Sequence, residues 1–541
     1  MQDFNWANPY PSARTPVFAR NIVSTSHPLA AQAGLRILLK GGNAVDATIA
    51  AAATIVQVEP VSCGLGGDCF AILWDGKELH GLNASGFAPA AWNPEYFRKK
   101  YGEDGKGIAQ QPMRGWDTVT VPGVVAGWAA LHEKFGKLPF GDLFEPAIEV
   151  AERGYAVPPM VAYKWGKAAE ELHSQPGFAQ AFMPHGRAPH ISEQFRLEGV
   201  ADTLRRIAQS KGRDFYEGEL AERIVAFARE TGGAMTMDDL RAYQPDWVKP
   251  IGCDYHGYTL HELPPNGQGI AALMALGMLE HFDLPSMPVD STQSQHLQIE
   301  AMKLAFADLY RYVADPRSMD VTPEQMLDDA YLRERARLIQ PDRAGRFEAG
   351  RPHSGGTIYL TAADESGMMV SFIQSNYMGF GSGVVVPDTG IALQNRGRGF
   401  SMDPASPNVV AGHKRPFHTI IPGFLTRGGR PVMSFGVMGG DIQPQGHLQT
   451  LIRMVDYQQQ PQAACCAPRW KVNRDFTLDI EKGMNRETVE GLRALGHVFH
   501  AENDPYMDFG AGQFIWRLSE DSGHGYVAAS DSRRDGQAVG F

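Results

Sequence analysis

The sequence predicts an α+β protein, with helices concentrated in the first part of the chain and strands in the last third. Apolar residues recur at helical spacing in several early segments, most clearly in His296–Tyr312, HLQIEAMKLAFADLYRY. After residue 356, short β-type runs alternate with turns that contain Gly and Pro. Arg346–Gly356, RFEAGRPHSGG, lies between the two parts and has the composition of a loop.

The predicted helices begin and end at residues suited to those positions. Pro28 starts the pattern of Leu29–Leu39, and Gly41 ends it. Asn43 is a suitable N-cap for a second helix, Ala44–Val56. Further helices are expected from Val121-Pro122-Gly123 to Gly136, over Asp142–Arg153 and over Thr203–Gln209. Their apolar faces are expected to pack in the core.

Strands are predicted from β-branched and apolar runs that end at turn residues. A turn at Glu365-Ser366-Gly367 joins the first two. The predicted strands are Thr357–Ala363, Met368–Gln374, Gly383–Val386, His418–Phe424 and Pro431–Phe435, the last running into Gly436–Gly440.

Composition is that of a globular protein. The chain has 541 residues, 43% hydrophobic and 21% charged, a length that corresponds to three or four ordinary domains. The net charge of −11 argues against a nucleic-acid partner. No apolar run is long enough to span a bilayer, and Met1–Trp6 lacks the pattern of a signal peptide. Five cysteines without a CxxC pair suggest buried thiols in a reducing cytoplasm.

The motifs of metal and nucleotide sites are missing. His132-Glu133 is not followed by a histidine at the HExxH spacing, and the 17 histidines are scattered. Gly64–Asp68, GLGGD, lacks both the third Rossmann glycine and a GK[ST] ending, so a tight turn is the better interpretation. We therefore expect neither a metal nor another cofactor.

Thr357 is the strongest candidate nucleophile. It opens a predicted strand directly after Ser354-Gly355-Gly356. A threonine hydroxyl needs an adjacent base, and cleavage of the preceding bond would supply one as the threonine's own α-amine. The glycines would let the backbone bend for that cleavage. From the residues alone, an ordinary strand-initiating threonine remains the simpler interpretation.

In the segment around Thr357, and in many others, the chain resembles the γ-glutamyltransferase family of N-terminal-nucleophile hydrolases. Matching segments follow one another in the family's order over nearly the whole length. They are His27–Ala30, Lys40–Ala47, Glu59-Pro60, Gly64–Gly67, Val121–Gly123, Glu300–Asp308, Thr357, Ala363-Asp364, Gly379–Gly383, Lys414–Pro416 and Gly439-Gly440.

The resemblance implies a four-layer αββα sandwich and an inactive precursor that cleaves itself between Gly356 and Thr357. A large subunit, 1–356, and a small subunit, 357–541, would then share one catalytic sandwich. The resemblance leaves open whether such pairs associate further into an oligomer. Thr357 Oγ would attack an amide of a small molecule, with the free α-amine as the base. The resemblance places a supporting hydroxyl at Ser375 and an oxyanion hole at Gly439 and Gly440.

The substrate-recognition residues of the family are altered in this chain. Ser85 stands where the family's transpeptidases hold the glutamyl α-carboxylate with an arginine. A pair of serines that bind the same carboxylate is replaced by His418-Thr419. The segment that offers an acidic partner to the α-amine reads NRGRGF here, with Arg396 and Arg398 and no carboxylate. These five residues and Tyr377 are the expected substrate-binding set.

Three functional hypotheses follow. One is an amidase for an acyl group without a free α-amine, such as an oxamate amidohydrolase or a cephalosporin or glutaryl acylase, with Arg396, Arg398 and His418 facing a substrate carboxylate. A second is γ-glutamyl hydrolysis in an altered pocket. The third is an uncleaved, non-catalytic binding protein. A solvated loop is the competing interpretation of the two arginines.

Overall fold

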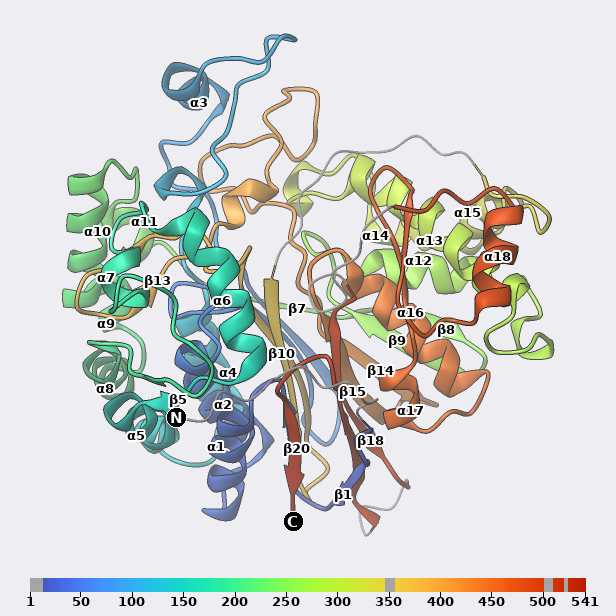
Figure 1. Ribbon diagram of the computed structural model, residues 1–541, viewed down its shortest axis with the longest axis horizontal. Helices are drawn as coiled ribbons and strands as arrows, with labels where there is room; N and C mark the ends of the chain where they lie inside the picture. Colours follow the sequence, from blue (N-terminus) through green and yellow to red (C-terminus); the bar gives the residue numbers. More distant parts are fainter. Residues whose placement is uncertain (1–12, 346–355, 501–508, 520–523) are drawn as a thin grey trace.

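The computed structural model describes residues 13–345, 356–500, 509–519 and 524–541 (Figure 1). Its centre consists of two seven-stranded sheets in which all neighbouring strands are antiparallel. Sheet I has the order β20 (Gln537–Gly540), β2 (Ile22–Thr25), β10 (Gly356–Ala363), β11 (Met369–Tyr377), β3 (Asp68–Trp74), β4 (Leu79–Ala84), β7 (Asp246–Val248). Sheet II has the order β1 (Val17–Ala19), β19 (Tyr526–Ser530), β18 (Ala511–Arg517), β15 (Arg430–Met438), β14 (Gly423–Arg427), β9 (Tyr258–Glu262), β8 (Ile251–Tyr255).

The two sheets face each other across a buried apolar layer. Phe70, Tyr359 and Ile373 of sheet I pack there with Phe424 and Ile515 of sheet II. Helices cover the outer face of each sheet, on the left and on the right of Figure 1. This arrangement buries both faces of the central strands, such as β3 and β11, which explains why these strands are apolar on both sides.

Helices of the first part of the chain lie on the outer side of sheet I. They include α1 (Pro28–Leu39), α2 (Ala44–Val58), α4 (Val124–Phe135), α5 (Glu145–Arg153), α6 (Pro159–Leu172), α7 (Phe178–Phe182), α8 (Val200–Ser210), α9 (Asp214–Glu217), α10 (Glu219–Thr231) and α11 (Met237–Arg241). All of α2 is buried, and its first turn has a capping box between Asn43 and Asp46. Helix α3 (Pro94–Tyr101) projects at the top of Figure 1.

Helices on the side of sheet II come from both halves of the sequence. They are α12 (Ile270–Leu279), α13 (Thr292–Tyr312), α14 (Pro323–Met326), α15 (Asp329–Ala336), α16 (Ile442–Val455), α17 (Pro461–Cys466) and α18 (Arg486–Ala494). Two-stranded ribbons complete the fold: β5 (Tyr155–Ala156) with β6 (Gln194–Phe195), β12 (Val385–Val386) with β13 (Ile391–Ala392), and β16 (Trp470–Val472) with β17 (Leu478–Ile480).

Most predicted elements are confirmed. Helices α1, α2, α4, α5, α8 and α13 lie where the periodicity placed them, and β10, β11 and β15 match the predicted strands. Gly64–Gly67 lies in the connection between α2 and β3, as expected, and Asp68 begins β3. The predicted loop 346–355 lies outside the described residues.

Two strand predictions were wrong in extent. The strand expected over His418–Phe424 begins only at Gly423, because the backbone before it bonds to loop residues and to Gln443 instead of a neighbouring strand. The strand expected over Gly383–Val386 is reduced to Val385–Val386. Strands β1 to β9 of the first part were not predicted. β3, DCFAILW, is an uninterrupted apolar run, which cannot be distinguished from a buried helix segment by its period.

The part of the chain before residue 356 and the part from residue 356 onward each contribute strands to both sheets. In sheet I, β10 and β11 lie between β2 and β3. In sheet II, β14 pairs with β9, and β19 pairs with β1. The five cysteines are unpaired. Within the described ranges, every helix is too short or too polar to cross a bilayer.

Candidate active site

Thr357 lies at an irregularity in the centre of sheet I. It is the second residue of β10 and is 3% exposed. Ile358 pairs with Gln374 of β11, whereas Gly356 pairs with Tyr377, so that two residues of β11 lie opposite Thr357. An extra residue of this kind bends a strand and redirects a side chain, and such bulges often adjoin active sites.

The hydroxyl of Thr357 has two polar neighbours. Ser375 Oγ lies 3.3 Å from Thr357 Oγ1, and either hydroxyl can donate. Gln443 Nε2 donates to the same oxygen at 3.4 Å. Ser375 Oγ also accepts from the backbone N–H of Tyr377 at 2.7 Å and from Arg396 Nη2 at 3.1 Å. One hydroxyl therefore separates Thr357 from a guanidinium group.

Arg396 is a completely buried cation beside this hydroxyl pair. Its Nη1 donates to Thr419 Oγ1 at 2.7 Å, and its guanidinium lies over the Tyr377 ring, 4.3 Å from the centroid. Its Nε has no hydrogen-bond partner among the described residues. Burial lowers the pKa of Arg396 to about 10, with Asp68 opposing that shift, so the group stays charged at neutral pH.

Asp68 is the buried carboxylate of the site. Its Oδ1 accepts from the backbone N–H groups of Gly86 at 3.1 Å and Gly123 at 3.2 Å, and its Oδ2 lies 3.1 Å from His418 Nε2. Burial raises the pKa of Asp68 to about 7, although the charge of Arg396 and the two N–H groups act in the opposite direction. Asp68 thus titrates near neutrality.

His418 is turned toward Asp68. Its ring is fully buried and packs on Phe70, with centroids 4.7 Å apart. Nδ1 accepts from the backbone N–H of Ile420 at 3.3 Å, so the proton of the neutral ring is on Nε2 and points at Asp68. Burial and the charge of Arg396 lower the pKa of His418. Both ring nitrogens are therefore occupied, and a neutral ring is a poor group for binding a substrate carboxylate.

Ser85 is fully buried and bonds to asparagine side chains. Its Oγ donates to Asn83 Oδ1 at 2.7 Å and accepts from Asn266 Nδ2 at 3.3 Å. Within the described part of the chain, it forms no hydrogen bond with Thr357 or Arg396. The structure therefore does not bring Ser85 to the hydroxyl pair, whereas it does bring Ser375, Tyr377 and Thr419 there through Arg396.

Arg398 belongs to the same one-turn 3-10 helix as Arg396, over Arg396–Gly399, but lies farther out. It is half-buried, and its Nη1 donates to Gln111 Oε1 at 2.8 Å. Burial raises the pKa of Tyr377, while the charges of Arg474, Arg396 and Arg398 oppose that rise. Arg396 and Arg398 thus bring positive charge near the Tyr377 phenol, whereas the charge of Arg474 is balanced by Asp441.

The glycine pair forms the turn between β15 and α16. Gly439 has φ = 131° and Gly440 has φ = 73°, conformations that disfavour a side chain. The Gly440 carbonyl accepts from Gln268 Nε2 at 2.9 Å and from the Gln443 N–H at 3.2 Å. Since Gln443 contacts Thr357, the turn lies at the Thr357 end of the site.

An ion pair braces the residue after this turn. Asp441 accepts from Arg474 Nε and Nη2, each at 2.9 Å, in a two-pronged geometry. The Arg474 guanidinium also lies over the Tyr310 ring, 4.9 Å from the centroid. This links the start of α16 to α13 and to the loop after β16.

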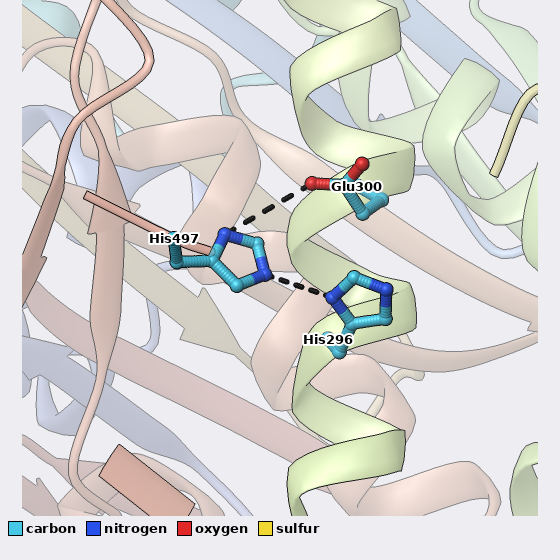
Figure 2. A group of neighbouring side chains, drawn as sticks. All are labelled: His296, Glu300 and His497. Carbon is cyan, nitrogen blue, oxygen red and sulfur yellow. Dashed lines mark hydrogen bonds and ion pairs between the residues drawn. The ribbon is translucent and has the colours of Figure 1, made fainter. Parts of the chain in front are cut away.

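A second buried cluster offers metal-ligand atoms away from Thr357. His296 and Glu300 of α13 and His497 have ligand atoms within 4.8 Å of one another (Figure 2). Lys303 Nζ donates to Glu300 Oε1 at 2.9 Å and to His497 Nδ1 at 3.1 Å. His497 Nε2 then donates to His296 Nδ1 at 2.8 Å, and His296 Nε2 donates to the Gln340 carbonyl at 2.8 Å. The Lys303 ammonium already binds the lone pair of His497 Nδ1 and the Glu300 carboxylate. These residues therefore fit a charged hydrogen-bond network better than a metal site.

Sequence reasoning missed several residues of the site. Asp68 closes a Gly-rich segment that we interpreted only as a turn. Gln443 stands three residues after Gly440, in the first turn of α16, which is a position aimed at the same site. Asp441 and Arg474 are 33 residues apart, and nothing in the sequence pairs them.

Known proteins share sequence with this chain over most of its length. The sequence profile of the family described as gamma-glutamyltranspeptidase matches residues 30–541. A glutathione hydrolase-like proenzyme of Bacillus subtilis is 36% identical over 96% of this chain and 98% of its own length. An oxamate amidohydrolase proenzyme of Klebsiella pneumoniae is 35% identical over 95% of this chain and 97% of its own.

A solved structure extends the agreement to three dimensions. The crystal structure of a cephalosporin acylase from Bacillus halodurans superposes with a TM-score of 0.94 at 46% identity, over 100% of this chain and 99% of that chain. These relatives are hydrolases made as proenzymes or acylases of closely similar fold. The chain belongs to the gamma-glutamyltranspeptidase family.

Proposed function

We propose that this chain is an autoprocessing amide hydrolase whose nucleophile is Thr357 and whose substrates carry a carboxylate on a short acyl group. Cleavage between Gly356 and Thr357 would give chains 1–356 and 357–541 within one αββα sandwich. The observation that carries the proposal is the buried Arg396 guanidinium, which shares the Ser375 hydroxyl with Thr357.

The chemistry follows from an N-terminal threonine. Thr357 Oγ attacks the amide carbonyl carbon, and its proton passes to the free α-amine of the same residue. Backbone N–H groups of Gly439 and Gly440 face the oxygen that becomes negative, a contribution of about 3 kcal/mol per donor in comparable sites. The C–N bond then breaks, and the leaving amine takes the proton. Water hydrolyses the resulting ester and restores the hydroxyl.

Charge in the site supports recognition of an anion. Arg396 is buried, charged and has an unpartnered Nε among the described residues. A carboxylate bound to it would lie within a few bonds of a carbonyl held at Thr357, because only Ser375 Oγ lies between the two groups. Arg398 adds positive charge on the Tyr377 side, whereas Arg474 is paired with Asp441. We assign Ser375, Tyr377 and Thr419 to this subsite, with His418 supporting it through Asp68.

A γ-glutamyl substrate is the second candidate, favoured by the glutathione hydrolase-like relative. Such a substrate brings an ammonium that needs an anion. The two carboxylates of the described site are already engaged, Asp68 with His418 and Asp441 with Arg474. This charge balance favours a dicarboxylic acyl group without an α-amine, in line with the oxamate amidohydrolase relative.

A chain-length series of monoamides tests the substrate. We would measure kcat/KM for oxamate, malonamate, succinamate and glutaramate, for a γ-glutamyl anilide and for propionamide, which lacks the carboxylate. We expect turnover of one or two adjacent members of the series and at least about 100-fold lower kcat/KM for propionamide, since a charge-assisted bond of this kind contributes about 3 kcal/mol. Turnover of the γ-glutamyl compound alone would reject an acyl group without an α-amine, because the γ-glutamyl group carries an ammonium as well as a carboxylate.

The nucleophile is tested by Thr357→Ala and Thr357→Ser. We expect the alanine variant to remain one chain of 59.2 kDa and to have no activity, and the serine variant to mature with reduced kcat. N-terminal sequencing of the wild-type small chain should begin at Thr357. A single uncleaved wild-type chain after long incubation would favour the non-catalytic hypothesis.

A further inference from the structure

The side-chain amide of Gln443 has one fixed orientation at the site. It is fully buried in the first turn of α16. Its Oε1 accepts from the backbone N–H of Ile421 at 2.9 Å, which directs Nε2 to Thr357 Oγ1 at 3.4 Å. Rotating the amide by half a turn would place two N–H groups against each other at Ile421. Gln443 therefore presents a donor, and not an acceptor, to the hydroxyl.

Neighbouring glutamines of α16 use their amides differently. Gln445 accepts from the Val472 N–H at 2.6 Å and donates to the carbonyls of Asp441 and Val472. Gln449 likewise bonds to the backbone of Trp470. These two side chains attach the helix to β16. Gln443 is distinct because its donor points at the hydroxyl of the proposed nucleophile.

We propose that Gln443 is a catalytic residue that donates a hydrogen bond to Thr357 Oγ whenever that oxygen carries negative charge. This inference rests on the proposed function of Thr357. The amide loses no proton in the cycle. In acylation the Oγ–carbon bond forms while the hydroxyl proton moves to the α-amine. In deacylation water adds to the ester carbon, the ester C–Oγ bond breaks, and the proton taken from water by the α-amine returns to Oγ.

Deacylation should depend on this donor most strongly, because Oγ is then the leaving group and accumulates charge as the ester bond breaks. The same turn that carries Gln443 carries Gly440, and the two are joined by the Gln443 N–H to Gly440 carbonyl bond of 3.2 Å. One helix start thus delivers donors to both oxygens of the tetrahedral intermediate, the former carbonyl oxygen and Oγ.

The test uses full-length Gln443→Met and Gln443→Glu, with Gln445→Met as the matched control from the same helix. Met has a similar length without polar atoms, and Glu keeps an acceptor for the Ile421 N–H. We expect both Gln443 variants to lose about 10- to 100-fold in kcat, with KM changed less than kcat. Intact-mass spectrometry should show the small chain accumulating as its acyl ester. Gln445→Met should lower the melting temperature but keep kcat within about twofold.

Maturation gives the second measurement, since the same oxygen attacks the Gly356 carbonyl during cleavage. A Gln443 variant that stays folded by circular dichroism and matures slowly supports the proposal. A variant that matures fully and keeps wild-type kcat without ester accumulation overturns it. If Thr357→Ala retains turnover, the proposed function itself fails. If Thr357→Ala is inactive while both Gln443 variants are normal, only the role of Gln443 is rejected.

Discussion

Arg396 determines the charge of the site. It is completely buried, and its partners on two sides are hydroxyl groups, those of Ser375 and Thr419, that do not neutralise it. Burying a guanidinium in this way is unfavourable unless a counter-charge compensates it. Asp68 supplies part of that compensation, since its charge opposes the lowered pKa of Arg396. We attribute the remainder to the substrate carboxylate.

Replacing Arg396 by Lys tests this assignment. Lysine keeps the charge but cannot contact two hydroxyls and a carboxylate with one planar group. We expect the KM for the carboxylate-bearing amide to rise about 10- to 100-fold. Turnover of propionamide, measured with the same preparation, should change little. An equal loss for both substrates would show that Arg396 acts on the nucleophile and not on the carboxylate.

Asp68 should make stability depend on pH. Its pKa is raised to about 7 in the folded protein, so between about pH 4 and pH 7 the folded state binds more protons at this residue than the unfolded state. The contribution of Asp68 to the free energy of unfolding is fully present below about pH 4, and it is lost as the pH rises through about 7. We expect Asp68→Asn to remove this decline, which is at most about 1.4 kcal/mol per pH unit.

The measurement is the melting temperature of wild type and Asp68→Asn between pH 5 and pH 8. The variant loses a hydrogen bond to His418 at every pH, so its melting temperature should lie below that of the wild type at pH 5. The two melting temperatures should approach each other toward pH 8. A constant difference between them from pH 5 to pH 8 would contradict the raised pKa of Asp68.

At the scale of elements, the start of α16 organises the site. The turn before it carries Gly439 and Gly440, its first turn carries Gln443, and Asp441 is held by Arg474 from the loop after β16. Asp441 occupies the N-cap position, but its side chain bonds to Arg474 and caps no helical N–H. The ion pair therefore holds the turn before α16 in place and does not cap the helix.

Arg474→Met should loosen this turn. The variant leaves a mostly buried carboxylate at Asp441 without its partner, which costs up to about 3–5 kcal/mol. We expect a lower melting temperature and a kcat reduced by about tenfold, because the glycine N–H groups lose their alignment. In the double variant with Asp441→Asn, much of the stability should return. Full additivity of the two single changes would show that the pair is not coupled.

On the scale of the whole molecule, cleavage after residue 356 would cut one chain without separating its halves. β10 and β11 remain hydrogen-bonded to β2 and β3, and β14 remains bonded to β9. The Lys303, His497 and His296 network adds a buried polar link between α13 and the last part of the chain. Separation of the chains would require both sheets to come apart.

The two mature chains should therefore stay together. We expect them to co-elute in gel filtration without denaturant and to separate only in denaturing gels. Excess EDTA should leave the melting temperature unchanged, whereas His497→Ala should lower stability by about 1–3 kcal/mol, because Lys303 and His296 lose a buried partner. Stabilisation by zinc at stoichiometric concentration would instead identify His296, Glu300 and His497 as a metal site.

Local patterns in the sequence predicted the elements with the clearest periodicity. Caps such as Asn43, the period of α13 and the turn between β10 and β11 are properties of neighbouring residues, and they were confirmed. Buried strands such as β3 were missed because a strand covered on both faces has no alternation to detect. Thr357 was singled out by its position after Ser354-Gly355-Gly356 and by the family resemblance, which also pointed to Ser375 and Arg396. Ser375 lies within hydrogen-bond distance of both Thr357 and Arg396.

By itself, the sequence determined the order of the main helices and the family, and it predicted Ser375 as a neighbour of Thr357. Only the tertiary structure decided that His418 faces Asp68, that Ser85 bonds to Asn83, and that Gln443 reaches the hydroxyl. Those contacts join residues that are far apart in the chain, and their direction depends on how two sheets pack. Local propensities carry no information about such packing, which is why it had to be observed.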